Sequence, residues 1–183
     1  MKNLFIEEKL NNYKNLNKYS KKGGTVCFGS SWFEGIDFGE IALDESLDCI
    51  IHNRSIKNLT VTEAKNVFEE SVKDLNPSKI FVNIGEEDIN DEDFNMESFL
   101  TNYELLLLFI HRNSPKSKIF IVSLHSDSET AREVNEKLYE LSENTNCKFI
   151  RLNTKENQIE TFNKIKPFIR NFPISFAEAM MAN

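Results

Sequence analysis

The chain has 183 residues, of which 40% are hydrophobic and 28% charged, and its formal net charge is -7. This composition is typical of a soluble globular protein and predicts one domain over residues 1–183, while the acidity argues against a nucleic-acid partner. No apolar run approaches the roughly 20 residues of a membrane-spanning helix, and the N-terminus (MKNLFIEEKL) does not resemble a secretory signal, so we expect a cytoplasmic protein without membrane contact.

The first predicted element is an N-terminal helix within residues 1–20, because Ile6, Leu10 and Tyr13 recur on one helical face. A turn at residues 21–24 then leads into the first of several short apolar runs rich in β-branched and aromatic residues, which predict buried strands. These runs cover residues 25–28, 48–51, 79–84, 118–124 and 147–152.

Helical patterns separate the later strands. They cover residues 60–75, 96–112, 128–143 and 158–170. Thr60 is suited to cap the first of them and Asn76-Pro77 to end it, whereas Pro167 is expected to kink or shorten the last. The mildly apolar tail, residues 172–183, is compatible with packing on the domain, packing on a partner subunit, or a frayed end.

Strands that alternate with helices predict an α/β protein, here a three-layer αβα sandwich around a five-stranded parallel sheet with a flavodoxin-like outline. Ligands of such sheets bind at the carboxyl ends of the strands. We therefore expect the functional residues in the loops at residues 29–33, 52–58, 85–88 and 125–127.

Three of these loops carry motifs in the order and spacing of a known family. They read VCFGSSWFEGI, IIHNRSIKNLTVTEA and LNPSKIFVNIGEEDIN. Together they resemble the SGNH (GDSL-type) hydrolases, in the bacterial branch that is similar to platelet-activating-factor acetylhydrolases. The resemblance extends to about Leu152 and implies the same fold that the alternating elements predict.

This resemblance implies hydrolysis of carboxylic esters and places Ser31 at the position of the nucleophile. The implied oxyanion hole consists of the Ser31 N–H, the N–H at position 58 and the side chain at position 87. Asn58 stands where the family has glycine; asparagine tolerates positive φ, so its N–H can still donate. Glu87 stands where the family has asparagine, and a carboxylate offers only acceptors, which removes about 3 kcal/mol of transition-state stabilisation.

The resemblance also implies an acid–base histidine after the fifth strand, but no histidine follows His125 in this chain. His125 and His52, which both lie near predicted strand ends, are the candidates for a substitute base, and Asp127 is suited to orient the first. Each is better explained as a partly exposed loop histidine, because a suitable distance and orientation toward Ser31 rarely arise by chance. Ser31 is likewise explained as a helix cap, because a serine without a base is a poor nucleophile.

Other features predict no cofactor and no metal. The acidic run over residues 86–93 lacks the spacing of a calcium loop and is typical of a solvated loop, in which Asp88 matches a structural family aspartate. Cys27, Cys49 and Cys147 have no metal-binding spacing and are expected to be buried, inert thiols. Trp32 and Phe33 are suited either to line an acyl pocket or to fill the core.

Two functions remain open on this basis. The first is a serine esterase or acylhydrolase acting on a lipid or acetyl-glycan ester, impaired by its altered oxyanion hole and missing histidine. The second is a catalytically inactive relative that binds a small-molecule ester, a glycan or another protein. The sequence leaves the oligomeric state open, including a homo-oligomer.

Overall fold

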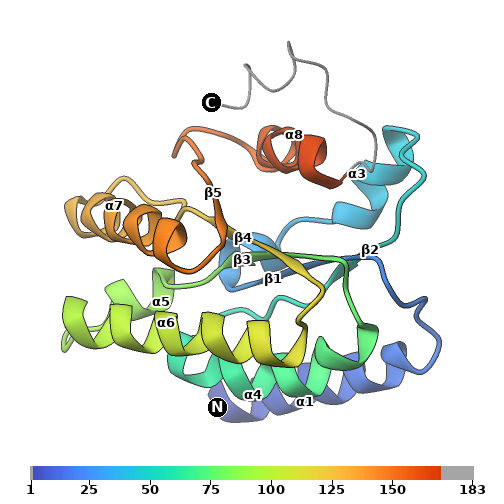
Figure 1. The fold of residues 1–183 in the computed structure, drawn as a ribbon, viewed down its shortest axis with the longest axis horizontal. Coiled ribbons are helices and arrows are strands. Elements are labelled where there is room, and N and C mark those ends of the chain that lie inside the picture. Colours follow the sequence, from blue (N-terminus) through green and yellow to red (C-terminus); the bar gives the residue numbers. More distant parts are fainter. Residues whose placement is uncertain (1, 170–183) are drawn as a thin grey trace.

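The chain forms a five-stranded parallel sheet with helices on both faces (Figure 1). A computed structural model describes residues 2–169, so the tail at 172–183 lies outside the described residues. The elements, in chain order, are α1 (Lys2–Asn17), β1 (Thr25–Gly29), α2 (Ser31–Glu34), α3 (Phe38–Asp44), β2 (Ile51–Asn53), α4 (Val61–Ser71), the short 3-10 helix η1 (Lys73–Leu75), β3 (Lys79–Asn83), α5 (Glu86–Ile89), α6 (Met96–Asn113), β4 (Lys118–Val122), α7 (Glu129–Asn144), β5 (Lys148–Ile150) and α8 (Gln158–Ile169). This architecture confirms the predicted αβα sandwich.

The strand order is β2-β1-β3-β4-β5, and every neighbouring pair is parallel. All residues of β1 and β3 are buried, as expected for central strands that helices cover on both faces. These two strands are in register from Thr25 opposite Lys79 to Gly29 opposite Asn83. The loops that follow them therefore leave the sheet side by side, which brings the Ser31 turn next to α5.

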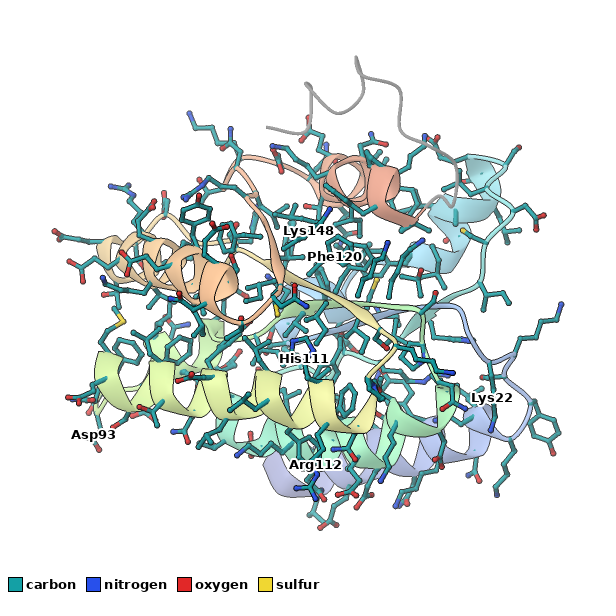
Figure 2. All side chains as sticks on the ribbon, viewed as in Figure 1. Lys22, Asp93, His111, Arg112, Phe120 and Lys148 are labelled. Carbon is teal, nitrogen blue, oxygen red and sulfur yellow. The ribbon has the colours of Figure 1, made fainter. Side chains whose placement is uncertain are left out.

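A hydrophobic core lies on each face of the sheet. The larger core contains buried side chains of α1, α4, α6 and α7, and the smaller contains those of α3 and α8. In Figure 1, α1, α4 and α6 lie below the sheet and α3 and α8 above it. Phe120 of β4 stacks on Phe81 of β3 in the smaller core, with ring centroids 4.6 Å apart (Figure 2).

The main differences from the predicted elements lie at β2, α3 and α8. The second strand covers residues 51–53 instead of 48–51, because Thr25 N–H bonds the Ile50 carbonyl and ladder pairing begins only at Ile51. Helix α3 was not predicted; it is seven residues long, with its first turn capped by Asp37. Helix α8 continues through Pro167 to Ile169.

None of the helices within residues 2–169 has both the length and the apolar character needed to cross a bilayer.

Candidate active site and cleft

Ser31 is the first residue of α2, which follows β1 after a sharp turn. The turn requires glycine at position 29, because a Cβ there would lie 2.6 Å from the Asn83 carbonyl oxygen. The next residue, Ser30, donates its N–H to the same carbonyl at 2.9 Å. These close approaches between the ends of β1 and β3 fix the position from which the half-buried Ser31 side chain projects.

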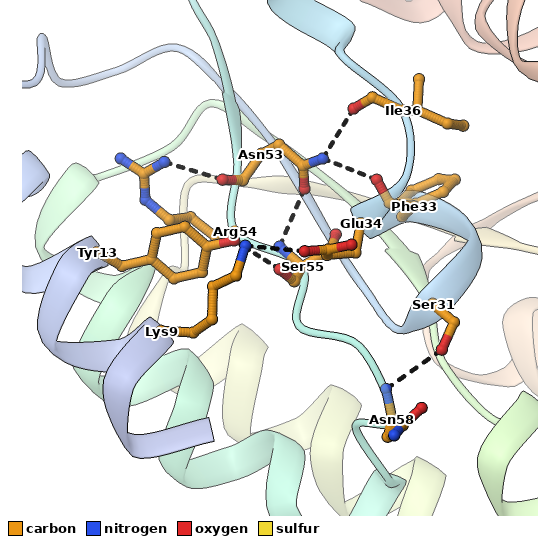
Figure 3. A network of polar contacts seen from close by, with 10 residues as sticks. All are labelled: Lys9, Tyr13, Ser31, Phe33, Glu34, Ile36, Asn53, Arg54, Ser55 and Asn58. Carbon is orange, nitrogen blue, oxygen red and sulfur yellow. Dashed lines mark hydrogen bonds and ion pairs between the residues drawn. The ribbon is translucent and has the colours of Figure 1, made fainter. Parts of the chain in front are cut away.

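The Ser31 hydroxyl has two partners. It accepts the backbone N–H of Asn58 at 3.2 Å (Figure 3) and donates to Glu87 Oε1 at 3.0 Å. Asn58 has a φ of 61°, the left-handed conformation in which glycine is favoured and asparagine tolerated. The structure therefore brings together the three positions that the sequence assigned to an oxyanion hole, and it places a carboxylate among them.

Glu87 is held on α5, a single turn after β3. Gly85 begins this turn with a φ of 131°, and a Cβ there would lie 2.9 Å from the Phe99 ring. The carboxylate of Asp88 accepts the backbone N–H of Val61 with both oxygens at 3.2 Å, which ties α5 to the start of α4. Asp88 therefore has the loop-holding contacts expected of a structural residue.

The two candidate bases have other partners. His125 Nε2 lies 2.9 Å from the Glu156 carbonyl oxygen, so this nitrogen carries the proton and donates it. Its ring stacks on Trp32, with centroids 3.6 Å apart and planes 5° apart. His52 Nε2 lies 2.9 Å from the carbonyl oxygen of Lys21, in the segment that precedes β1. Within residues 2–169, neither histidine forms a hydrogen bond with Ser31.

Burial and the nearby Arg54 charge lower the pKa of His52, although its contact with the Lys21 carbonyl opposes them. The remaining histidine, His111, lies near the end of α6 and projects from the opposite side of that helix to Arg112 (Figure 2). Its Nε2 is 2.9 Å from the Thr145 carbonyl oxygen. The three histidines thus each bond a backbone carbonyl with Nε2, and His125 alone lies beside the Ser31 helix.

A cleft of about 410 Å³ is lined by Glu87, whose carboxylate accepts the Ser31 hydroxyl, but not by Ser31 itself. The residues that line it come from the loops after β3, β4 and β5, and they are Glu86, Glu87, Ile89, Asn90, His125, Ser126, Asp127 and Thr154. Most of these side chains are polar, and neither lysine nor arginine is among them. Burial and the negative charge of Glu87 raise the pKa of Glu86 to about 7. The hydrogen bond from the backbone N–H of His125 to the Glu86 carboxylate has the opposite effect and lowers this pKa.

A network of polar contacts holds the Ser31 helix against the loop that carries Asn58 (Figure 3). Asn53 Nδ2 donates to the carbonyls of Phe33 at 2.7 Å and Ile36 at 3.0 Å, while Asn53 Oδ1 accepts the N–H of Ser55. One amide side chain thus links the end of α2 to the loop between β2 and α4. This role of Asn53 was not predicted, because both carbonyl partners are distant in sequence.

A second set of contacts ties α1 to the same region. Lys9 forms an ion pair with Glu34 at 2.8 Å, and Tyr13 donates its hydroxyl to the Ser55 carbonyl at 2.6 Å. The buried Arg54 guanidinium lies over the Tyr13 ring, 5.0 Å from its centroid, and bonds the Asn17 side chain. The N-terminal helix therefore supports both loops that position Ser31 and Asn58.

The described residues, 2–169, contain no group of three or more histidine, cysteine or acidic side chains arranged to hold a metal ion. Cys27 is buried, whereas Cys49 and Cys147 are half-buried, and none of the three forms a disulfide within residues 2–169. Burial raises the pKa of Cys27 and of Cys147, so neither environment activates a thiolate.

No family model matches the sequence, and no curated protein matches it either. Solved structures with the same fold do match. A Streptococcus pneumonia protein described as a platelet activating factor is 18% identical, with a TM-score of 0.76 over 91% of this chain and 93% of its own. A GDSL-like lipase from Bacteroides thetaiotaomicron is 16% identical, with a TM-score of 0.63 over 78% and 77%.

An acetyl-xylooligosaccharide esterase from Geobacillus, in a mutant form, is 17% identical, with a TM-score of 0.55 over 88% of this chain and 92% of its own. These neighbours are SGNH-type hydrolases, and the chain has their α/β fold. The comparison confirms the fold that the resemblance of the three sequence motifs implied.

Proposed function

We propose that this protein is a relative of the SGNH esterases that binds an uncharged, oxygen-rich ligand in its cleft and does not hydrolyse esters through Ser31. The observation that carries this proposal is the hydrogen bond from the Ser31 hydroxyl to the Glu87 carboxylate, in place of one to a histidine. In that contact a carboxylate takes the place of the histidine that would accept the serine proton. The same carboxylate stands where an amide would donate to the oxyanion.

The expected loss of rate is large. A glutamate carboxylate is ordinarily a weaker base than imidazole by roughly a hundredfold. The loss of one oxyanion-hole donor costs about 3 kcal/mol, or roughly another hundredfold. A negative charge beside the developing oxyanion opposes the reaction further. An esterase with these two changes would therefore be slower by roughly four orders of magnitude before that repulsion is included.

The cleft itself supports a binding function. Its volume suits a small molecule, and its lining offers carboxylates, hydroxyls and an amide rather than a hydrophobic surface. Carboxylates and amides hydrogen-bond the hydroxyl groups of a carbohydrate, whereas acidic side chains repel an anionic ligand. Because one structural neighbour is an acetyl-xylooligosaccharide esterase, we choose xylotriose and its acetylated form as probes.

A second candidate function is slow ester hydrolysis by Ser31. It is supported by the Asn58 N–H, which lies 3.2 Å from the Ser31 hydroxyl and retains part of an oxyanion hole. For this reaction His125 would have to exchange its bond with the Glu156 carbonyl for one with Ser31.

Turnover of p-nitrophenyl acetate and acetylated xylotriose distinguishes the two functions. We expect the wild-type protein to hydrolyse both no faster than Ser31→Ala, with Ser30→Ala as a control for the same chemical change one residue earlier. Binding is measured through the emission of Trp32, the single tryptophan of the chain. Turnover that disappears only in Ser31→Ala would establish the esterase instead.

A further inference from the structure

Glu86 and Glu87 are adjacent in the cleft but have different partners. Glu87 accepts the Ser31 hydroxyl at 3.0 Å, whereas Glu86 accepts the backbone N–H of His125 from the neighbouring loop. Both side chains are half-buried, and both line the cleft. Ionisation of one of these carboxyl groups disfavours ionisation of the other, because the second negative charge must form beside the first in a partly desolvated site.

The surroundings of Glu86 offer little positive charge to offset a negative one. The titratable groups that share the cleft lining with it are Glu87, His125 and Asp127. Helix α7 packs against α5, and its first charged residues, Glu129 and Arg132, are exposed to solvent. On α5 itself, the Asp88 carboxylate bonds the N–H of Val61. The adjacent carboxylates therefore favour a proton on Glu86.

We propose that Glu86 is a specificity-determining residue: its protonated carboxyl group donates a hydrogen bond to a carbonyl, ether or hydroxyl oxygen of a carbohydrate ligand. When Glu86 ionises, this hydrogen bond is lost and the ligand is released. This proposal rests on the proposed function of the cleft as a binding site. Glu87 is the less suitable donor, because its carboxylate already accepts the Ser31 hydroxyl. A protonated carboxyl supplies the hydroxyl donor that a carboxylate lacks.

The pH dependence follows from the direction of this shift. The pKa of Glu86 is raised to about 7, so the protonated form dominates below pH 7 and is lost as the pH rises through it. The apparent affinity is proportional to the fraction of the protein that is in the binding-competent form. Binding through protonated Glu86 should therefore be about tenfold weaker at pH 8 than at pH 6.

The protonation of Glu86 can be measured without a ligand. In the full-length protein with ¹³C-labelled glutamate, carboxyl resonances are followed by NMR from pH 4 to pH 9, and Glu86→Gln identifies the Glu86 signal by its loss. We expect a midpoint near 7, which falls only partway toward the ordinary value of 4.5 in Glu87→Gln, because burial still raises it there, and changes less in Asp127→Asn. An ordinary midpoint in the wild-type protein would overturn the proposal.

The ligand role is tested by titrating xylotriose and acetylated xylotriose against Trp32 emission at pH 6 and pH 8. The wild-type protein should lose about tenfold in affinity at pH 8, and Glu86→Gln should bind equally at both values, because an amide keeps a donor at any pH. Equal wild-type affinities, or no binding of either sugar at pH 6, would overturn this assignment. Ester turnover, measured separately, decides whether the cleft is catalytic.

Discussion

A carboxylate at position 87 reverses the chemistry available to Ser31. With an amide there, the side chain could donate to an oxyanion; the carboxylate instead accepts the serine hydroxyl and carries negative charge into the same space. Burial, together with that negative charge, raises the pKa of the neighbouring Glu86. The two residues together account for both the expected loss of hydrolysis and the expected pH dependence of binding.

The sequence predicted only some of the residues that meet at the carboxyl ends of the strands. Ser31, Asn58 and Glu87 were expected to meet because each follows a strand of a parallel sheet, and they do. His52 was grouped with them for the same reason. Strand β2 extends to Asn53, however, so His52 lies within the strand opposite Val26 and bonds Lys21 instead. Side-chain direction depends on the exact register, which the apolar pattern does not give.

Gly85 provides a stability test of the loop that carries both glutamates. Gly85→Ala should lower the free energy of unfolding by about 2–4 kcal/mol, because its φ of 131° is strained for alanine and the new Cβ would meet Phe99 at 2.9 Å. Gly23→Ala is the matched control, since Gly23 also has positive φ but no atom lies within 4 Å of a Cβ there. Urea denaturation of both variants measures the difference; equal losses would contradict the packing argument.

Among the elements, α2 depends on contacts from outside the helix. It is four residues long, too short to be stable alone, and the side chain of Asn53 donates to the carbonyl of Phe33 in the helix and to that of Ile36 just beyond it. Asn53 stands in a recognised sequence block, yet its partners Phe33 and Ile36 lie 20 and 17 residues away. Such long-range side-chain bonds, like the short helix α3, leave no periodic signal in the sequence.

Replacing Asn53 tests this dependence. Asn53→Ala should destabilise the protein by about 2–3 kcal/mol, because the carbonyls of Phe33 and Ile36 each lose a side-chain donor and the N–H of Ser55 loses its acceptor. Asn53→Asp should cost more, since a carboxylate would face both carbonyl oxygens. Asn144→Ala, which removes an exposed bond to the Glu140 carbonyl, is the control and should change stability by less than about 0.5 kcal/mol. The measurement is the urea midpoint, and a milder effect of aspartate than of alanine would contradict the account.

At the scale of the whole molecule, the sheet was the most predictable feature. Five apolar runs separated by helical patterns predict a parallel sheet, and right-handed crossovers leave few strand orders to consider. The observed order β2-β1-β3-β4-β5 brings the loops after β1, β3 and β4 to one edge. The altered chemistry at that edge could be anticipated from the residue types, but the Trp32–His125 stack and the raised pKa of Glu86 depend on packing.

The central claim is that Ser31 lacks an effective proton acceptor, and covalent labelling tests it most directly. The intact protein is incubated at neutral pH with a fluorophosphonate, and the adduct is followed by mass spectrometry in the wild type and in Ser31→Ala. We predict that the wild-type protein gains no adduct beyond that of the variant. Rapid, stoichiometric labelling that requires Ser31 would contradict the account.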